Sequence, residues 1–453
     1  MRSARSLKTT LGPAQILRLK LAKFIPATLA LFAATPTTRA GDFIAGADFS
    51  HLQFFADRGI VYKAGGQPQD GLAILKSNGL NCVRLRLFTS SAAQAQADPY
   101  DYTNNLNYTL SLAVRVKNAG LQFLLDFHYS DSWADPGKQT KPAAWTNLTF
   151  TQLQQQMYDY NSNTIASFKA AGALPDYIQI GNEIRSGLLW TNGLVSGSSN
   201  TAWSNLGKLM KAAINGIKDA AGTNQPKILI HIDRGGDWTT TQWFFDNVLY
   251  QQIPFDIIGQ SYYPWWHGDL NALSNCLNNA AQRYHKPVMV LETAFPWTNS
   301  VPPSYNPNLG IPLTPAGQVQ YTIALASVVK GVSGGKGAGI FWWGTEYVQL
   351  SGYSLANFEK TSFFDYGGNA LPVAAAFGQL AAPLNIQAAL ANGSLSLQWP
   401  LSGAGMKLTR VTNLSPAAPW LTVTNPVQTT GIVFNTTIPL GTSPASFYRL
   451  QSN

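Results

Sequence analysis

The sequence predicts an α/β fold, a (β/α)8 barrel, followed by a small all-β C-terminal module. Eight short apolar segments alternate with amphipathic ones between residues 41 and 380. The apolar segments are nearly continuous in hydrophobicity, which is typical of parallel strands covered on both faces. The composition then changes near residue 381. These observations predict three parts: a leader at 1–40, a barrel at 41–380 and a β module at 381–453.

The first forty residues have the features of a secretory signal. They hold seven Lys or Arg and no acid, then the apolar run "FIPATLALFAA" and the sequence "TRA" before Gly41. The run is shorter than the roughly 20 residues of a spanning helix. We expect cleavage after Ala40, a secreted or periplasmic protein and no later membrane span, with an uncleaved anchor as the alternative. Outside the leader 24 bases face 22 acids, so the overall charge of +9 does not indicate a nucleic-acid partner.

The barrel prediction rests on eight strand candidates, which are 44–49, 82–88, 121–129, 177–183, 228–233, 257–263, 288–293 and 339–345. Segments with helical spacing lie between them, among them 70–79, 108–120, 202–222 and 318–331. Gly79, Gly120, Gly172 and Gly222 end helices in this prediction. An open doubly wound sheet would carry a Gly-rich phosphate turn after an early strand, and "GADFSHLQ" contains none.

Residues 381–453 contain no Asp or Glu and show short alternating strands separated by turn residues. We therefore assign the β module no chemistry. A sugar-binding, attachment or stabilising role is open. Trp399 and Trp420 are its large aromatic residues, and packing in its core is favoured over sugar stacking.

Polar residues gather where the predicted strands end, which is where a (β/α)8 barrel builds its active site. These are Asp48, Arg84, Arg86, His128, Asp131, Asn182, Glu183, Asp233, Asp237, Tyr262, Tyr263 and Glu292. Glu183 follows the fourth strand and Glu292 the seventh, so the two carboxyl groups are expected to face each other across the barrel. A retaining glycosidase needs such a pair, one as acid/base and one as nucleophile. For either Glu alone, a helix cap or an ion pair is an equally good interpretation.

Tryptophans also concentrate after strands, which favours a cleft that stacks sugar rings. Trp133, Trp297 and Trp343 are the candidates for such contacts, together with Tyr262 and Tyr263. Asn182 can bind a sugar hydroxyl, for which we favour the 2-OH. Arg84 and Arg86 share one face of their strand, and at least one is expected to keep Glu292 ionised.

Several of these segments together resemble glycoside hydrolase family 53, the endo-β-1,4-galactanases. They are "GADFS", "DFHYSDSWADPGKQTKPAAW", "GNEIRSGLLW", "GQSYYPWW", "VLETAFPW" and "IFWW". The resemblance covers residues 41–380 and implies a retaining endo-hydrolase of the β-1,4-galactan side chains of pectin. It implies that Glu183 is the acid/base and Glu292 the nucleophile. Asn182, His128, Tyr262 and Trp343 are then neighbours of the bound sugar.

Two features depart from the family pattern. Arg234 in "HIDRGGDW" stands where a plainer turn is expected, which affects the sugar contacts nearby. Residues 294–314 contain no Asp, Glu or Cys, so neither the calcium nor the disulfide that braces this region in some relatives is supported.

Two other functions stay open beside the galactanase. One is a retaining barrel hydrolase of another β-1,4-polysaccharide, such as mannan or cellulose, and the other is a non-catalytic carbohydrate-binding protein. The five His have no metal-ligand spacing, and no nucleophile elbow precedes a helix. We expect a monomer without metal or cofactor, whose partner is the polysaccharide. Cys82 and Cys276 are expected to be buried free thiols.

Overall fold

The computed structural model describes residues 16–18, 29–33, 43–197, 199–415, 417–440 and 445–451. Two compact units divide the chain: Phe43–Ala381, and Met1–Asp42 together with Ala382–Asn453. Of the predicted leader, only the strands β1 (Ile16–Arg18) and β2 (Leu29–Ala33) are described. The rest of the leader prediction lies outside the described residues, so cleavage after Ala40 stays a prediction.

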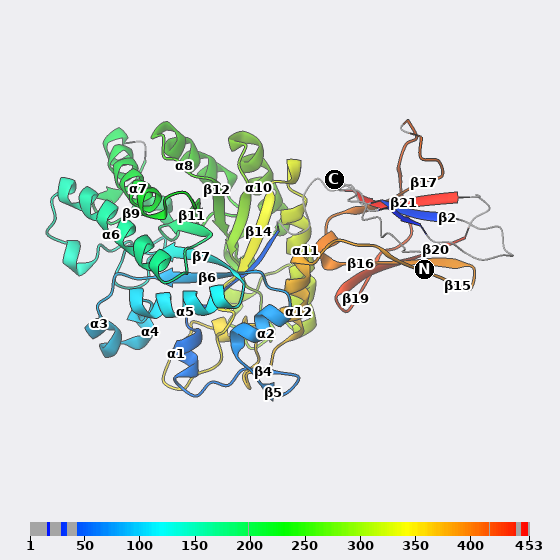
Figure 1. The fold of residues 1–453 in the computed structure, drawn as a ribbon, viewed down its shortest axis with the longest axis horizontal. Helices are drawn as coiled ribbons and strands as arrows, with labels where there is room; N and C mark the ends of the chain where they lie inside the picture. Colours follow the sequence, from blue (N-terminus) through cyan, green and yellow to red (C-terminus); the bar gives the residue numbers. More distant parts are fainter. Residues whose placement is uncertain are drawn as a thin grey trace, which may run out of the picture. The chain divides into compact units, whose positions relative to one another are not determined.

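The larger unit is a closed barrel of eight parallel strands, as the sequence predicts (Figure 1). In the order of their pairing, the strands close a ring through β11, β12, β13, β14, β3, β6, β7 and β8. Their bounds are β3 Ile44–Asp48, β6 Cys82–Leu87, β7 Gln122–Phe127, β8 Tyr177–Ile180, β11 Lys227–Ile232, β12 Ile257–Ser261, β13 Val288–Glu292 and β14 Gly337–Trp342.

Helices cover the outside of the barrel (Figure 1). The main ones are α2 Gly71–Ser77, α5 Leu106–Asn118, α6 Phe150–Ala170, α7 Asn200–Ala221, α8 Trp238–Tyr250, α10 Leu270–Tyr284, α11 Pro315–Lys330 and α12 Pro372–Gly378. The four predicted helices are among them. Gly79, Gly120, Gly172 and Gly222 all have positive φ, between 70° and 101°, which is the reason for glycine just beyond a helix.

Most of the predicted strands run one to three residues too far toward their carboxyl ends. β8 stops at Ile180 rather than at residue 183, because Gly181 and Glu183 adopt φ of +80° and +49°. Neither value fits a strand. The ladder therefore ends just below the polar residues, which lie on the first residues of the loops.

The barrel interior changes from apolar to polar toward the carboxyl ends of the strands. An apolar layer includes Ile44, Leu124, Leu229 and Phe341. Closer to the carboxyl ends of the strands, the inward-facing side chains are polar and fully buried. They are Asp48, Arg84, Asp126, Gln179 and His231. Buried charges are stable only when paired, so this polar layer predicts an ordered network under the barrel mouth.

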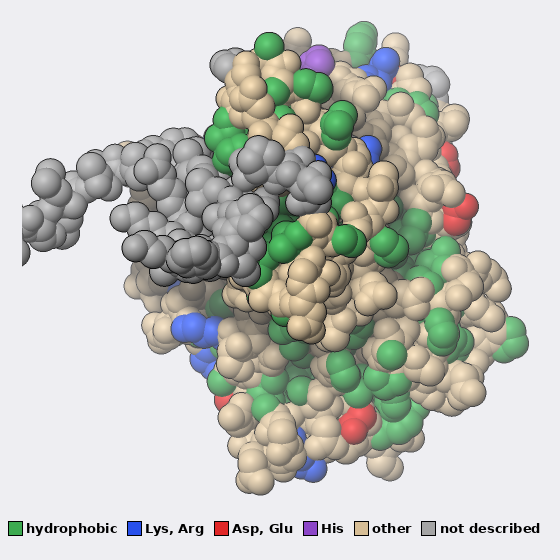
Figure 2. All heavy atoms as spheres, turned by 90° about the vertical axis from the view of Figure 1, so that its right-hand side faces the viewer, with side chains coloured by type: hydrophobic (Ala, Val, Ile, Leu, Met, Phe, Trp, Pro, Cys, Tyr) green, Lys and Arg blue, Asp and Glu red, His purple; other side chains and the backbone are tan. Residues whose placement is uncertain are grey.

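The smaller unit contains two sheets, with strand orders β1-β2-β21-β17-β18 and β15-β16-β20-β19. Their bounds are β15 Gln387–Ala391, β16 Ser394–Pro400, β17 Lys407–Val411, β18 Leu421–Thr422, β19 Gln428–Thr430, β20 Val433–Pro439 and β21 Ala445–Gln451. Trp399 packs in the core of this unit, 3% exposed, and the Arg449 guanidinium lies 4.1 Å from the Trp420 ring centre. In Figure 2 hydrophobic side chains are scattered over the visible face and charged ones are few.

Cys82 and Cys276 are free and buried, as predicted. Among the helices that the structure describes, none combines the length and the apolar character that crossing a membrane requires.

Candidate active site

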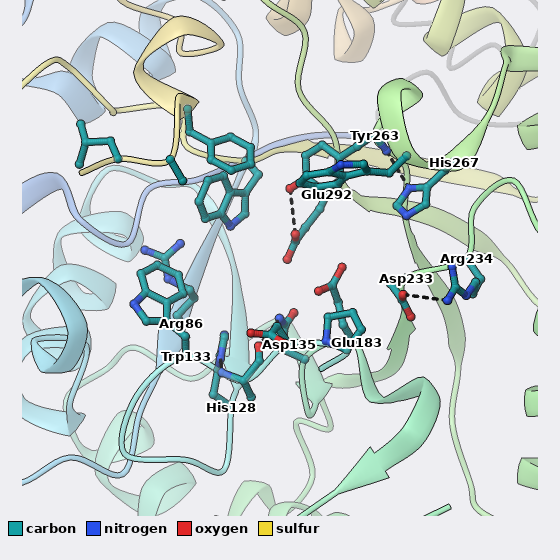
Figure 3. Close-up of a pocket in the computed structure, with 18 of the residues that line it drawn as sticks. Arg86, His128, Trp133, Asp135, Glu183, Asp233, Arg234, Tyr263, His267 and Glu292 are labelled. Atoms are coloured by element: carbon teal, nitrogen blue, oxygen red, sulfur yellow. Dashed lines mark hydrogen bonds and ion pairs between the residues drawn. The ribbon is translucent and has the colours of Figure 1, made fainter. Parts of the chain in front are cut away.

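A pocket of about 610 Å³ opens at the carboxyl ends of the barrel strands (Figure 3). It brings together seven residues that the sequence predicts for the site. These are Arg86, His128, Trp133, Asn182, Glu183, Glu292 and Trp343. Tyr263, an eighth, lines it as well. The carboxyl groups of Glu183 and Glu292 point toward one another inside the pocket (Figure 3).

Glu183 lies two residues beyond the glycine turn that ends β8. Its φ of +49° is uncommon for a residue with a side chain, and backbone strain of this kind costs about 1–3 kcal/mol. Oε1 of Glu183 accepts a hydrogen bond of 2.6 Å from the Ser261 hydroxyl. The strained turn therefore aims the carboxyl group at β12 rather than along its own strand.

Glu292 is the last residue of β13 and is 6% exposed. Its Oε1 lies 3.0 Å from Nη2 of Arg84, and its Oε2 accepts a hydrogen bond of 2.9 Å from the Tyr263 hydroxyl. Burial, Glu292 and Glu183 raise the pKa of Tyr263 well above its ordinary value. Tyr263 consequently keeps its proton and acts as a permanent donor to Glu292.

Ser261, the last residue of β12, lies beside both glutamates in different ways. It is paired in register with Glu292, after an irregularity in the β12–β13 ladder between Gln260 and Ser261. Its hydroxyl also contacts Nε2 of His231 at 2.9 Å. Ser261 therefore bonds to Glu183 through its side chain and pairs with Glu292 through its backbone.

The two carboxyl groups differ in their electrostatic surroundings. Burial, together with the charges of Glu292 and Asp233, raises the pKa of Glu183 well above its ordinary range. Burial raises the pKa of Glu292 as well, but Arg84 and the Tyr263 hydrogen bond oppose that rise. On titration Glu292 therefore loses its proton first, and Glu183 retains its own to higher pH.

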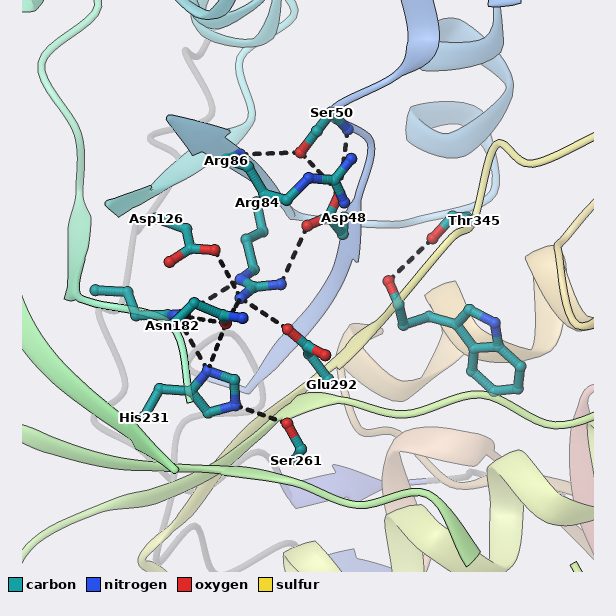
Figure 4. A network of polar contacts seen from close by, with 12 residues as sticks. Asp48, Ser50, Arg84, Arg86, Asp126, Asn182, His231, Ser261, Glu292 and Thr345 are labelled. Atoms are coloured by element: carbon teal, nitrogen blue, oxygen red, sulfur yellow. Dashed lines mark hydrogen bonds and ion pairs between the residues drawn. The ribbon is translucent and has the colours of Figure 1, made fainter. Parts of the chain in front are cut away.

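Beneath the pocket, Arg84 is the centre of a buried polar network (Figure 4). Its Nη1 donates to Asp48 at 3.1 Å and its Nη2 to Asp126 at 2.8 Å. Its Nε donates to Gln179 at 3.2 Å. Asp48 also binds Nη1 of Arg86 at 3.0 Å. With every edge of the guanidinium occupied, Arg84 has a fixed position under Glu292.

Asn182 is fixed by the same network. Its Oδ1 accepts from Nη2 of Arg84 at 3.0 Å, and its Nδ2 donates to the Ala134 carbonyl at 2.9 Å. One hydrogen of that amide group stays available for a ligand.

His128 has both ring nitrogens engaged. The Ala134 amide donates to Nδ1 at 2.9 Å, so Nε2 carries the proton and donates to Asp126 at 3.1 Å. Burial alone would raise the pKa of Asp126, but Arg84 and His128 hold it below its ordinary value. His128 thus borders the pocket with its ring and has no nitrogen left for hydrogen bonding.

Two tryptophans and one arginine form a second wall of the pocket. The Arg86 guanidinium carbon lies 4.4 Å from the centre of the Trp133 ring and 5.7 Å from that of Trp343. The two indole rings are 6.2 Å apart between centres. This wall offers aromatic faces beside a charged group, a combination that suits the mixed polar and C–H surface of a sugar.

Five further predicted site residues do not line the pocket. Asp48 and Arg84 lie in the network beneath it. Asp131 accepts from Thr89 at 2.7 Å and from the Ala143 amide at 2.9 Å. Tyr262 donates to the Gly268 carbonyl, and the Trp297 indole to the Glu359 carbonyl. These last three fix loops around the mouth.

Gln179, His231, Ser261 and Asp126 position the site residues but were not predicted from the sequence. Each stands at an inward position within an apolar strand, as in "YIQI" or "ILIHI". Alternate residues of a strand face the same side. A single polar residue at an inward-facing position of an otherwise apolar strand is the signal that could have identified them. Trp266 also lines the pocket and was not among the predicted site residues. Among the residues that the structure describes, no group of three or more His, Cys, Asp or Glu is placed to hold a metal ion.

A closed (β/α)8 barrel with two facing carboxyl groups at its mouth defines a glycoside hydrolase. Residues 44–377 match the model of Glycosyl hydrolase family 53. The chain belongs to this family.

The chain is also similar to three other proteins. An uncharacterized protein of Niallia circulans is 39% identical over 73% of this chain and 92% of its own length. The arabinogalactan endo-β-1,4-galactanase of Thermothelomyces thermophilus is 35% identical over 71% of this chain and 95% of its own. The GH53 catalytic domain of Ignisphaera aggregans is 33% identical, with a TM-score of 0.68, over 76% of this chain and 96% of that one.

Proposed function

We propose that this glycoside hydrolase cleaves β-1,4-galactan internally and with retention, using Glu183 as acid/base and Glu292 as nucleophile. The observation that carries the proposal is the unequal setting of the two carboxyl groups. Glu292 contacts Arg84 and Tyr263, whereas Glu183 accepts a hydrogen bond from the Ser261 hydroxyl. A retaining enzyme needs one carboxylate that is ionised and one that is protonated at the same pH.

In the first step an oxygen of Glu292 attacks the anomeric carbon. The bond from that carbon to the glycosidic oxygen breaks, and this oxygen takes the proton of Glu183. A glycosyl ester on Glu292 and an ionised Glu183 result. Arg84 and Tyr263 hold the Glu292 side chain in position during the attack, and the free amide hydrogen of Asn182 is placed to bind the sugar.

In the second step Glu183 acts as a base. It removes a proton from water, whose oxygen attacks the anomeric carbon while the ester bond to Glu292 breaks. Two substitutions at one carbon restore its original configuration. Glu183 is protonated again and Glu292 is free for the next turnover.

The sugar under attack is proposed to lie against Trp133 and Trp343, on the side of the pocket that holds Arg86. Galactan as the substrate is supported by relatives named arabinogalactan endo-β-1,4-galactanase. We propose that the natural substrate is the β-1,4-galactan side chain of pectin, degraded outside the cell by a monomer without metal or cofactor.

Secretion is supported by the leader of seven bases and one apolar run. We propose that the mature protein begins at Gly41, with a catalytic domain to residue 380 and a β module at 381–453. The mass of the protein recovered from culture medium tests this start. A mass that includes residues 1–40 contradicts it.

Release of reducing sugar from galactan, mannan and cellulose tests the substrate. Galactan is expected to be cleaved at a rate at least tenfold above the other two. Cleavage of mannan or cellulose alone contradicts the proposal.

Glu183→Gln and Glu292→Gln test the two roles. Each is expected to lower kcat by about 10³-fold or more and to retain binding of galactan oligosaccharides. Asp219→Asn serves as the control, because Asp219 is exposed on α7 and bonds only to Tyr158. Turnover at the wild-type rate in either Gln variant removes that residue from its role.

A further inference from the structure

Arg234, which stands where the sequence analysis expected a plainer turn, lies in the pocket on the side away from the tryptophan wall. It is the second residue after β11 and lines the pocket together with Asp233. Figure 3 shows Arg234 and Asp233 on one side of Glu183, and Trp133 and Arg86 on the other. In the proposed function Glu183 protonates the leaving oxygen, so Arg234 faces the sugar that leaves.

Two arginines share one carboxylate on this side of the pocket. Asp233 accepts from Nε of Arg185 at 3.1 Å, and its other oxygen lies 3.7 Å from Nη2 of Arg234. Two guanidinium groups therefore share one carboxylate, and the closer partner is Arg185. Burial and Arg234 lower the pKa of His267 to about 4, so this neighbour is uncharged at neutral pH.

The Arg234 guanidinium has unused hydrogen-bonding capacity. Its Nε is buried and has no partner, although the side chain as a whole is 29% exposed. The side chain lines the pocket and shares Asp233 with Arg185, so its five N–H donors are not all used and some remain for a ligand oxygen.

Trp266 supplies an aromatic surface in the same pocket. It lines the pocket and is 54% exposed. Its ring packs at 5.7 Å from the rings of Trp265 and Tyr305, so it is held from behind while one part faces solvent. An indole face and an arginine in one pocket can bind the C–H face and the carboxylate of an acidic sugar.

We propose that Arg234, with Trp266, forms a binding site for a carboxylate-bearing sugar on the leaving-group side of the pocket. This inference rests on the proposed function, because that function defines which side the leaving group occupies. The site gives the enzyme a preference for chains that carry a uronate or another sugar acid just beyond the bond that is cleaved. Neutral galactan remains a substrate and lacks this contact.

Two forms of β-1,4-galactotetraose, matched in shape, test the site. Oxidation of the reducing end gives an aldonate with one negative charge, and reduction gives an alditol without charge. Both end units are open chains, so they differ mainly in the carboxylate. The kcat/KM of each is measured at low ionic strength, and the masses of the products identify the bond that is cleaved.

We expect wild-type enzyme to prefer the aldonate about fivefold, as a partly exposed charged hydrogen bond allows. The preference is expected to fall to about one in Arg234→Gln, in which the side chain stays polar and loses its charge. Arg283→Gln is the matched control, since Arg283 pairs with Asp246 on the outer helices. It should keep the full preference.

A salt series on the wild-type enzyme gives a second test that needs no variant. The preference for the aldonate should disappear at about 0.5 M salt, because salt screens partly exposed charges, while cleavage of the alditol stays constant. Any of three results overturns the inference but not the proposed function. They are equal cleavage of both substrates by the wild type, a preference that remains in folded Arg234→Gln, and a preference that does not depend on salt. Failure to cleave the alditol or galactan overturns the proposed function as well.

Discussion

The Ser261 hydroxyl lies 2.6 Å from Oε1 of Glu183 and donates a hydrogen bond to it. The same hydroxyl is 2.9 Å from Nε2 of His231, whose pKa burial and Arg84 lower well below the ordinary value. A neutral His231 with its proton on Nε2 donates to Ser261, which directs the serine hydrogen toward Glu183. This chain of donors places the exchangeable proton of Glu183 on the oxygen that Ser261 does not contact.

Ser261→Ala removes the one hydrogen bond to Glu183 that favours its ionised form. The pKa of Glu183 should therefore rise further, and the alkaline limb of kcat/KM against pH should move to higher pH. The loss of a hydrogen bond to a charged group, about 1.5 kcal/mol, predicts a kcat about tenfold lower at neutral pH. An alkaline limb that stays in place, or moves to lower pH, contradicts the coupling of Ser261 to Glu183.

Tyr263→Phe keeps the ring and removes the hydroxyl 2.9 Å from Glu292. Because this hydrogen bond lowers the pKa of Glu292, its loss should raise that pKa and move the acid limb of the pH profile to higher pH. The value of kcat should fall about tenfold. Tyr262→Phe is the control, since the Tyr262 hydroxyl bonds to the Gly268 carbonyl and the acid limb should not respond to it.

Arg84→Gln tests the buried network beneath the pocket. The change removes the Arg84 guanidinium, which lies 3.1 Å from the Asp48 carboxylate and 2.8 Å from that of Asp126. Removing one partner of a buried ion pair lowers the free energy of unfolding by about 3–5 kcal/mol. Denaturant unfolding should show a loss of this size, whereas Arg115→Gln, at a half-exposed pair with Asp70, should cost less than about 1 kcal/mol.

Glu183→Gln is expected to stabilise the fold at neutral pH. The pKa of Glu183 is raised in the folded state. Its contribution to the stability of the fold is therefore complete below about pH 4, and this stability is lost as the pH rises through the folded pKa. Above that pKa, ionising a buried carboxyl group opposes folding, and Gln avoids this cost. The variant should gain on the order of 1–2 kcal/mol at pH 8 and nothing near pH 4. A stability difference that is independent of pH contradicts the raised pKa.

The sequence predicted the barrel and its carboxyl pair because both leave local signals. Glu183 and Glu292 each follow an apolar run, so their places at the mouth follow from the strand order. The end of β8 was predicted at residue 183, whereas the ladder ends at Ile180 because Gly181 and Glu183 adopt positive φ.

The direction of side chains in loops leaves no comparable signal. Asp131 and Trp297 follow strands in the sequence as His128 and Trp343 do, yet they bond to neighbouring loops. Residues such as Ser261 and His231 act through partners on other strands, and such partners are set by the closure of the barrel rather than by spacing along the chain.

The most direct test of the carboxyl pair is the configuration of the first product. Proton NMR of galactan oligosaccharide hydrolysis, recorded before the anomers equilibrate, distinguishes the two outcomes. The β-anomer should form first, because an attack by Glu292 and a second attack by water restore the configuration. First formation of the α-anomer would mean a single displacement by water, and would contradict the role of Glu292 as nucleophile.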